Sequence, residues 1–389
     1  MIPVRAEAAK STKNAAADRQ NLLDTIENRR LLLDMQKPLL KWFEANKRDL
    51  PWRKNPNAYQ VWVSEIMLQQ TRVEAVKEYY RRFLKALPDI KALAHAQEDE
   101  LLKLWEGLGY YNRVRNMQKA ALIVLEQYDS RMPADFDKLL ELPGIGSYTA
   151  GAIASIAYQI PVPAVDGNVL RVCMRILEND SDIQKQSVKK AVEKLLLQIM
   201  PKTNPGAYNQ ALMELGATVC IPNGAPKCGQ CPAARVCQGY LHGTAERLPV
   251  KSVKKQRKIE EKTLFVILDE KNAVLRKREP NGLLAGLYEI PNTDGSLNEE
   301  QALHWLKAEG FRTLQIEELP SAKHIFSHIE WRMKAYLVKV QTMLPGIYQY
   351  KKEAGERPFI IAEREKIKKE IPIPSAFAYY QKYIERSCR

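Results

Sequence analysis

The sequence predicts a multidomain protein in which an all-α domain precedes a smaller α+β domain. Its 389 residues exceed the usual length of one compact domain. From about residue 21 to residue 243, apolar residues recur three and four positions apart, which is typical of helices. Beyond a basic, polar stretch the apolar spacing changes to two, which is typical of strands, and a few helical segments follow. This order of elements favours an α+β domain in the C-terminal part.

Composition and periodicity place three boundaries along the chain. Residues 1–20 have no apolar periodicity, and we expect a flexible N-terminal arm there. The helical domain then covers residues 21–243, and the α+β domain covers residues 263–389. Between them, residues 244–262 lack an apolar stripe and are predicted to form a basic interdomain linker. The cations of this linker are Lys251, Lys254, Lys255, Arg257 and Lys258.

Within the second domain the sequence predicts strands separated by helices. The predicted strands are 263–268, 273–276, 286–290, 322–327 and 332–340. The predicted helices are 299–309, 362–369 and 375–384.

The charge of the chain indicates a polyanionic partner. There are 60 Lys and Arg against 46 Asp and Glu, a net charge of +14. A surface this basic attracts nucleic acid most often, although a soluble basic protein without such a partner has the same balance. The sequence contains neither an apolar run long enough to span a membrane nor a signal peptide. We therefore expect a cytoplasmic protein, with a transit peptide as the less favoured alternative.

Four cysteines form the strongest candidate for a metal site. Cys220, Cys228, Cys231 and Cys237 fall within eighteen positions and are separated by seven, two and five residues. In a reducing compartment, such crowding favours metal ligation over disulfides. Four thiolates suit zinc or a four-iron cluster, and the presence of a single CxxC knuckle favours the cluster. Chance clustering of core thiols is the alternative.

A glycine-rich hairpin lies between the helical stretches 136–141 and 147–158. Its sequence, LPGIGSYTA, starts at Leu142 and contains Gly144 and Gly146. Without side chains at these two positions the backbone can approach a phosphate, which the amides that open the second helix would bind. Such a contact holds a DNA strand without reading its sequence. An ordinary turn between helices explains a glycine pair equally well.

Asp166 precedes an apolar helix and follows a proline-rich stretch, so it is a candidate helix N-cap. Backbone amides that hold a capping carboxylate keep it ionised, which suits the stabilisation of positive charge on a sugar ring. A purely structural cap is the alternative.

Glu65 is the second candidate carboxylate. Its helical neighbours three and four positions away are largely apolar: Val61, Trp62, Leu68 and Gln69. Burial on such a face would raise the pKa of Glu65 toward the range useful to a general acid, while Asp166 stays charged. A structural salt bridge of Glu65 is the alternative.

Together, the hairpin, the acidic residue that follows it and the four-cysteine loop resemble the endonuclease III superfamily of helix-hairpin-helix DNA glycosylases. The segment SEIMLQQT at residues 64–71 and the C-terminal extension resemble its adenine DNA glycosylase branch, MutY, which removes adenine mispaired with 8-oxoguanine. The resemblance covers residues 30–385. It implies a base excision repair enzyme that carries a 4Fe-4S cluster, binds double-stranded DNA containing that mispair and acts as a monomer. In a bacterium such a protein would be nucleoid-associated.

The resemblance also assigns catalytic roles. Tyr148 occupies the hairpin position that carries a Schiff-base lysine in strand-cutting members, and tyrosine cannot supply that amine. Base removal without strand cleavage is therefore expected. By resemblance, Glu65 protonates the adenine ring nitrogen and later acts as a base on water. Asp166 would stabilise the oxocarbenium-like sugar, with Tyr148 and Asn168 beside it.

Five further positions carry over by motif. Gln69, Gln70 and Tyr110 resemble residues that wedge into the base stack around the lesion pair. Arg53 and Gln210 resemble residues that line the adenine pocket, where an amide can pair with a base edge. Without the family, Tyr110 and Tyr111 would both be interpreted as core aromatics.

The C-terminal domain resembles the Nudix hydrolases. Phe326, Ser327 and His328 resemble the loop that recognises 8-oxoguanine in the adenine glycosylase branch. Residues 282–310 lack the glutamate-rich pattern with which a Nudix hydrolase binds magnesium, although they include Glu299, Glu300 and Glu309. We therefore expect a domain that recognises the lesion, and no second hydrolase.

The cysteine loop departs from the family in one respect. Seven residues separate Cys220 from Cys228, whereas the family commonly has six. The intervening residues 221–227 are rich in turn formers and can absorb the extra residue as a bulge. We expect the cluster to be retained and to position the basic residues Lys227 and Arg235 on DNA.

Three other functions fit parts of this pattern. A glycosylase with lyase activity or specificity for another base would share the hairpin and the cysteines. A DNA-binding protein with a cluster and no activity would use Glu65 and Asp166 structurally. A Nudix-type nucleotide hydrolase is the least favoured.

Overall fold

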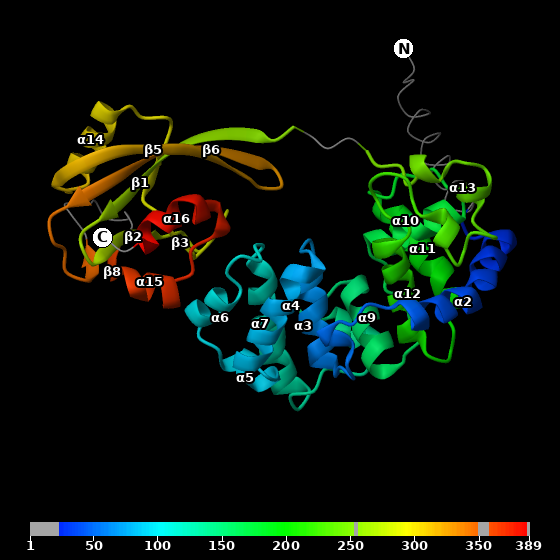
Figure 1. Ribbon diagram of the computed structural model, residues 1–389. Coiled ribbons are helices and arrows are strands. Elements are labelled where there is room, and N and C mark those ends of the chain that lie inside the picture. The colour runs from blue at the N-terminus through cyan, green and yellow to red at the C-terminus, as the bar shows by residue number, and fades with distance from the viewer. Residues whose placement is uncertain (1–22, 253–255, 349–357, 387–389) are drawn as a thin grey trace, which may run out of the picture. The chain divides into compact units, whose positions relative to one another are not determined.

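The computed structural model describes residues 23–252, 256–348 and 358–386 (Figure 1). The predicted N-terminal arm and the linker residues Lys254 and Lys255 lie outside the described residues. The chain divides into two compact units. Each unit has its own core, and the multidomain fold predicted from the sequence is confirmed by its helical and sheet-containing halves.

The first unit is helical and combines the described residues before residue 95 with residues 116–252. Its helices are α2 (Ile26–Asn46), α3 (Ala58–Leu68), α4 (Val73–Ala86), α5 (Ile90–His95), α7 (Asn112–Gln127), α8 (Phe136–Leu140), α9 (Ser147–Tyr158), α10 (Gly167–Ile176), α11 (Gln186–Ile199), α12 (Pro205–Thr218) and α13 (Gln238–Leu241). Helix α5 ends, and helix α7 begins, within the segment that clusters with the second unit. Short 3-10 turns lie at Pro51–Arg53, Cys228–Gln230 and Ala245–Arg247. In the described part of the chain, every helix is too short or too polar to cross a membrane.

Local sequence explains where the helices of the site begin. Asn57 and Gln60 form a reciprocal capping box at the start of α3. Asp166 caps α10, as its position in the sequence predicts. Asn204 caps α12, with Pro205 at the first helical position, where its missing N–H costs nothing.

One buried cluster joins helices α2, α10, α11 and α12 beside the cysteine loop. Its members recur at helical spacing, as Leu32, Met35 and Leu39 do along α2, and these side chains are almost fully buried. Helix α12 packs against α2, α9 and α10 and therefore lies at the centre of this half. The packing fixes the ends of α9 and α10, which border the candidate site.

The second unit combines residues 95–115 with the described residues from 256 onward. It contains α6 (Glu98–Leu104), α14 (Glu299–Ala308), α15 (Arg364–Glu370), α16 (Ala378–Glu385) and a 3-10 turn at Ser375–Phe377. The strands are β1 (Lys258–Leu268), β2 (Asn272–Lys277), β3 (Tyr288–Glu289), β4 (Asn292–Asp294), β5 (Thr313–Ile325), β6 (Ile329–Val340), β7 (Gly346–Tyr348) and β8 (Phe359–Glu363). The sheet order is β5-β6-β1-β2-β8-β7, with β3 beside β2 and β4 beside β1.

The sheet is buried on both faces. Alternate residues of β1 point to opposite sides, so Leu264 and Val266 join α15 and α16 in one core, whereas Phe265 and Ile267 join α14 in the other (Figure 1). Strand β6 runs parallel to β1 and antiparallel to β5. The long β5-β6 hairpin therefore carries the segment Phe326–His328 at its tip.

Several strands differ from their predicted bounds. Strand β1 begins at Lys258, five residues before the predicted start at Thr263. Its first residues are mostly exposed, so they show no apolar alternation, and pairing with β6 holds them in the sheet. The strand predicted at 286–290 is reduced to Tyr288–Glu289, and β4, β7 and β8 had no counterpart in the prediction.

Candidate active site

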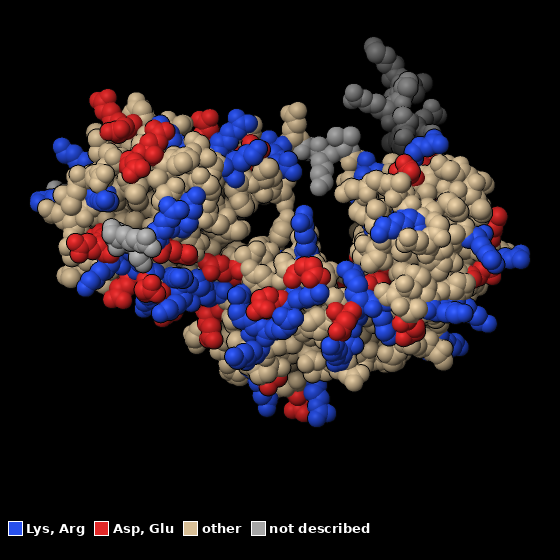
Figure 2. Space-filling view, in the orientation of Figure 1, with Lys and Arg blue, Asp and Glu red and all other residues tan. Residues whose placement is uncertain are grey.

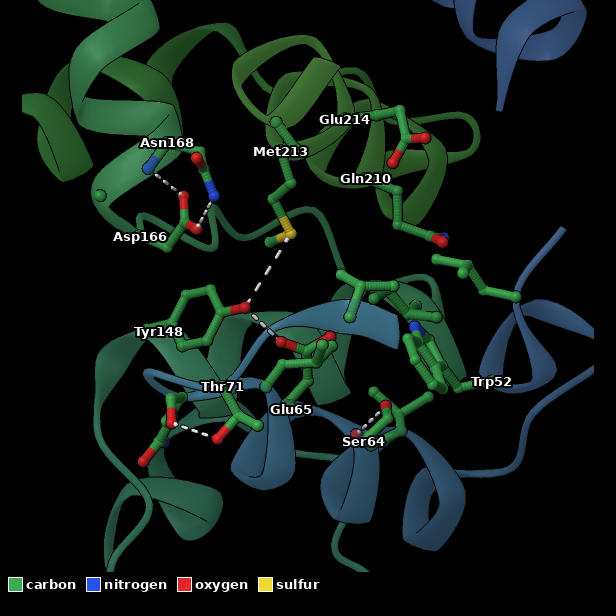
Figure 3. Close-up of a pocket in the computed structure, with 18 of the residues that line it drawn as sticks. Trp52, Ser64, Glu65, Thr71, Tyr148, Asp166, Asn168, Gln210, Met213 and Glu214 are labelled. Atoms are coloured by element: carbon green, nitrogen blue, oxygen red, sulfur yellow. Dashed lines mark hydrogen bonds between the residues drawn. The ribbon is translucent and has the colours of Figure 1, made fainter. Parts of the chain in front are cut away.

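The first unit contains a cavity of about 580 Å³, bordered by α3, α9, α10 and α12 (Figure 3). Eight of the residues singled out from the sequence line it: Arg53, Glu65, Gln69, Gln70, Tyr148, Asp166, Asn168 and Gln210. These residues come from positions up to 157 apart in the sequence, so the fold itself assembles the site.

Glu65 lies on α3 with only 6% of its surface exposed. Its carboxylate accepts a hydrogen bond from the Tyr148 hydroxyl (Figure 3). Burial raises the pKa of Glu65 to about 7, and the negative charge of Asp166 adds to the effect. The hydrogen bond from Tyr148 and the positive charge of Arg53 act in the opposite direction. The sequence-based expectation of a raised pKa at Glu65 agrees with this geometry.

The alternative interpretation of Glu65, a structural salt bridge, does not agree with the contacts of this side chain. Arg53 is the cation whose charge acts on the pKa of Glu65. Its guanidinium pairs with a different carboxylate, with Nη2 2.8 Å from Glu214 Oε2. Within the described residues, no lysine or arginine forms an ion pair with Glu65. The carboxylate is therefore a buried acid that faces a cavity.

Tyr148 lies in the first turn of α9 and points into the same cavity (Figure 3). Its hydroxyl is also 4.0 Å from the sulfur of Met213. Burial, together with the charges of Glu65 and Asp166, raises the pKa of Tyr148 well above 10. The phenol therefore stays neutral and acts as a hydrogen-bond donor toward Glu65.

Asp166 accepts hydrogen bonds from the backbone amides of Asn168 at 2.9 Å and Val169 at 2.8 Å. The side-chain amide of Asn168 donates a third at 2.7 Å. The sequence led us to expect that these donors keep the carboxylate readily ionised. Burial outweighs these donors and raises the pKa of Asp166 above its ordinary value. Ionisation of this carboxylate near neutral pH stays a prediction.

A buried arginine connects Asp166 to the cysteine loop. Arg171 Nη2 donates to Asn168 Oδ1 at 2.8 Å and to the Gly216 carbonyl at 2.7 Å. Its Nε donates to the carbonyl of Cys220 at 2.7 Å. Asn168 is thus held from both sides, and the orientation of Asp166 depends on contacts outside the cavity.

Gln69 and Gln70 follow the last turn of α3, at the rim of the cavity. Gln70 has a φ of 59°, a left-handed conformation that is uncommon outside glycine. Tyr110, which the sequence grouped with these two residues, lies in the second unit and has a φ of 47°. It is 51% exposed, whereas the adjacent Tyr111 is buried, so only Tyr111 is a core aromatic.

The glycine-rich hairpin joins α8 to α9. Gly144 has a φ of 77°, and a Cβ there would lie 2.7 Å from Asn116 Cβ, so glycine is required. Gly146 is the N-cap of α9, where no side chain caps the helix. The region around Gly146 is open, so the first amides of α9 are accessible to an anion.

The four cysteines line a second, small cavity in the first unit. None of them forms a disulfide. Arg175 Nη1 lies 3.3 Å from Cys220 Sγ, and the backbone of Lys227 donates to Val219 O at 3.0 Å, closing the lengthened loop. In the described part of the chain, no three His, Cys, Asp or Glu side chains are placed to hold a single metal ion. All four cysteines nevertheless line the same cavity.

The tip of the β5-β6 hairpin holds the predicted lesion-recognition residues. Ser327 and His328 are exposed, and Phe326 packs edge-on against Trp331, with ring centroids 4.9 Å apart. The amide of Phe326 donates to Ile329 O at 2.8 Å, which closes the turn. Ser327 Oγ lies 3.1 Å from the hydroxyl of Tyr110, within the same unit.

Comparison with known proteins matches the two halves of the chain to two different families. Residues 63–198 match the HhH-GPD superfamily of base excision DNA repair proteins, and residues 263–381 match the NUDIX domain. An adenine DNA glycosylase from Buchnera aphidicola subsp. Acyrthosiphon pisum is 35% identical over 316 residues, covering 81% of this chain and 88% of the relative. This chain belongs to the adenine DNA glycosylase family.

Two mammalian members of the adenine DNA glycosylase family show the same relationship. The Homo sapiens protein is 34% identical over 368 residues, covering 79% of this chain and 67% of the relative. The Mus musculus protein is 35% identical over 356 residues, covering 77% and 69%. Membership of this family confirms the recognition made from the hairpin, the SEIMLQQT segment and the C-terminal extension.

The structure of this glycosylase adds residues that the sequence analysis missed. Glu214, on α12, is almost fully buried at the cavity wall and accepts hydrogen bonds from Arg48 Nε at 2.7 Å and Arg53 Nη2 at 2.8 Å. These donors outweigh burial and hold the pKa of Glu214 at about 2. A carboxylate among the apolar residues ALMELG was the available signal, the same signal that identified Glu65.

The Nudix-like half of this glycosylase carries its glutamates on and beside helix α14. Helix α14 turns Trp305 inward, where it stacks on Phe265 at 4.1 Å between ring centroids. Glu299 and Glu300 lie in the first turn of that helix and are exposed. Among the residues that the structure describes, no three His, Cys, Asp or Glu side chains of this half lie together as a metal-binding group.

Proposed function

We propose that this protein is a monofunctional glycosylase that excises adenine paired with 8-oxoguanine from double-stranded DNA. The observation that carries the proposal is the buried Glu65, whose pKa is about 7, facing a cavity that Asp166 also lines. A carboxyl with this pKa can give and take a proton near neutral pH.

The cavity is large enough to receive one nucleobase that has been flipped out of a duplex. Gln210 and Arg53 present an amide and a guanidinium toward it, groups that suit the edge of a purine. Tyr148 restrains Glu65 by its hydrogen bond. The base would therefore meet the acid in a fixed orientation.

The proposed reaction has two steps. Protonated Glu65 gives its proton to a ring nitrogen of adenine as the glycosidic bond breaks, and the bonding electron pair leaves with the base. The sugar becomes oxocarbenium-like, and the ionised carboxylate of Asp166 stabilises its positive charge. Water then adds to the sugar carbon and loses a proton to Glu65. The products are neutral adenine and an abasic sugar.

Tyr148 supports base removal without strand cleavage. A lyase needs an amine that forms a Schiff base with the opened sugar. The hairpin places a neutral phenol in the cavity instead.

DNA binding is assigned to backbone amides and basic side chains. The open N-terminus of α9 at Gly144 and Gly146 suits a phosphate, and the chain carries a net charge of +14. Gln69, Gln70 and Tyr110 would enter the base stack, and the Phe326–His328 tip would read the 8-oxoguanine. Two of these three wedge residues have left-handed backbones, a conformation that concentrates at functional sites.

Cys220, Cys228, Cys231 and Cys237 are the proposed ligands of a 4Fe-4S cluster. The four thiols line one cavity, and a set built on a single CxxC knuckle is less typical of zinc, which usually pairs two such knuckles. A larger group with several metal atoms fits the donor set better. Its contribution would be structural, holding the loop of Lys227 and Arg235 in place; iron analysis and the visible absorbance of the purified protein distinguish it from zinc.

The decisive test uses one oligonucleotide duplex with adenine opposite either 8-oxoguanine or guanine. The parent should leave an alkali-labile abasic site at adenine, with the 8-oxoguanine duplex preferred. Glu65→Gln should remove the activity and retain DNA binding. If Glu65→Gln excises adenine as fast as the parent, the proposed mechanism is wrong. Covalent trapping of the parent by borohydride would instead indicate a lyase, and binding without base release would indicate a DNA-binding protein.

A further inference from the structure

Helix α6 and the turn that follows it carry three charged residues that contact the C-terminal part of the same unit. Asp99 and Lys103 lie four positions apart on one face of α6, and Glu106 follows in the turn just after the helix ends at Leu104. Their partners in this part of the unit lie between residues 277 and 373. The three side chains are named here the α6 stripe.

Lys103 is the centre of the α6 stripe. Its ammonium donates to the carbonyl of Ile371 at 3.0 Å and to that of Ile367 at 3.4 Å. These carbonyls belong to the C-terminal end of α15, where Ile371 is the C-cap and its amide already donates to the Ile367 carbonyl. Lys103 adds a donor at this end, where helix carbonyls lack a full set of internal partners. Lys103 also pairs with Glu106 at 2.7 Å, and only 17% of its side chain is exposed. It therefore serves as a helix cap supplied from a distant part of the chain.

The other two residues of the α6 stripe complete the contact. Glu106 Oε1 accepts a hydrogen bond from the amide of Ile373 at 2.8 Å. Asp99 accepts from the Tyr288 hydroxyl at 3.0 Å, and Lys277 Nζ lies 3.4 Å from it. Each of these contacts is polar and directional, so together they fix the position of α6 against the sheet domain.

The turn that follows α6 holds Tyr110. Trp105 Nε1 donates to Gly109 O at 3.1 Å, and Arg113 Nη2 donates to the same carbonyl at 3.1 Å. Tyr110 emerges from this turn in a left-handed conformation, and its hydroxyl lies 3.1 Å from Ser327 Oγ. Anything that fixes α6 against α15 therefore also fixes Tyr110 beside the Phe326–His328 tip.

We propose that the α6 stripe is a positioning element that holds Tyr110 and the Phe326–His328 tip together, and so sets the preference for the base opposite adenine. This step rests on the proposed function, because it assigns 8-oxoguanine recognition to the tip. The stripe acts through Tyr110 and Ser327. Its residues are positioning residues and take no part in bond breaking.

The first measurement is base selectivity under single-turnover conditions. Lys103→Met removes the ammonium and keeps the apolar stem, and Lys103→Arg keeps the charge and the donors. Lys77→Met is the matched control, since Lys77 forms an i,i+3 ion pair with Glu74 on α4 and belongs to the first unit. Lys103→Met should reduce the preference for the 8-oxoguanine duplex over the guanine duplex by about tenfold, as a small misplacement of a recognition group can do. Lys103→Arg and Lys77→Met should keep the preference of the parent.

The second measurement is hydrogen–deuterium exchange of the full chain without DNA. In Lys103→Met, peptides covering residues 105–115 and the Phe326–His328 tip should exchange at least about fivefold faster, because the contact that orders them is lost. The control variant should exchange like the parent. If Lys103→Met changes neither the base selectivity nor the exchange rates, the positioning role of the α6 stripe is wrong. A parent enzyme without any 8-oxoguanine preference would overturn the proposed function, and the exchange result would then decide the positioning role alone.

Discussion

At the scale of single residues, the active site is a balance of effects on one carboxyl group. Burial raises the pKa of Glu65, whereas the hydrogen bond from Tyr148 lowers it. The outcome, a pKa of about 7, suits the proposed role of Glu65 as an acid in one step and a base in the next.

Excision should therefore depend on pH in a defined direction. Because the first step needs protonated Glu65, the single-turnover rate should fall as pH rises above about 7. In Tyr148→Phe, the hydrogen bond that lowers the pKa of Glu65 is lost, so this alkaline limb should move to higher pH. Rate measurements between roughly pH 5.5 and 9 test both statements. A limb at the same pH in both proteins would show that another group controls it.

The same pKa has a cost for folding. The folded state holds the Glu65 proton up to about pH 7, whereas an exposed glutamate releases it near 4.5, so the folded state loses stability as pH rises through this window. Glu65→Gln should remove that loss and raise the free energy of unfolding at pH 8 by up to about 3 kcal/mol relative to the parent. Urea unfolding at pH 5 and pH 8 measures it, with the exposed Glu78→Gln as control. Equal pH dependence in parent and variant would contradict a buried, raised pKa.

At the scale of elements, the close packing of α12 on α10 controls the site. A Cβ at Gly216 would lie 2.6 Å from Asn168 Cβ and 3.1 Å from its carbonyl oxygen. Asn168 in turn donates to Asp166. The contact between these helices thus determines where the Asp166 carboxylate lies.

Gly216→Ala should therefore impair catalysis more than it impairs folding. We expect the excision rate to fall by at least about tenfold and the free energy of unfolding to fall by about 1–3 kcal/mol, the usual cost of overpacking. Gly229→Ala is the matched control, because nothing lies within 4 Å of a Cβ there. Single-turnover kinetics and urea unfolding measure the two effects. A variant as active as the parent would show that Asn168 can shift without moving Asp166.

Elements that are specified locally could be predicted from the sequence. Helix α9 begins and ends where its spacing and hairpin glycines placed it, at Ser147 and Tyr158. Strands held by distant partners could not: the exposed start of β1 depends on β6, and β8 depends on β2. The α6 stripe was missed for the same reason, since its charged side chains look solvated until their partners are known.

The candidate site shows a similar division. The burial of Glu65 follows from its apolar neighbours along one helix, and the cap at Asp166 follows from the residues beside it. The pKa of Asp166 could not be predicted, because it depends on burial contributed by the whole cavity. Glu214 was missed because its partners Arg48 and Arg53 lie more than 160 residues away along the chain.

At the scale of the whole molecule, charge governs the encounter with DNA. On the face drawn in Figure 2, Lys and Arg side chains are spread over both units among fewer Asp and Glu. A net charge of +14 distributed in this way should bind many phosphates, each of which releases counterions.

The affinity for duplex DNA should accordingly be strongly salt-dependent. The dissociation constant of Glu65→Gln for a duplex should rise by at least about tenfold between 50 and 200 mM salt. Binding titrations at several salt concentrations give the slope. Using this variant keeps base release out of the measurement. An affinity that does not change with salt would contradict phosphate contacts as the main source of binding.

The separation of α6 from its partners along the chain has a consequence for synthesis. Glu106 accepts a hydrogen bond from the amide of Ile373, which is synthesised 267 residues after Glu106. While a ribosome extends the chain, α6 must wait through most of translation before α15 exists. An apolar seam left open that long would invite aggregation, whereas charged side chains remain hydrated. Because the α6 stripe is polar, we expect this early segment to stay hydrated and soluble until α15 has been synthesised.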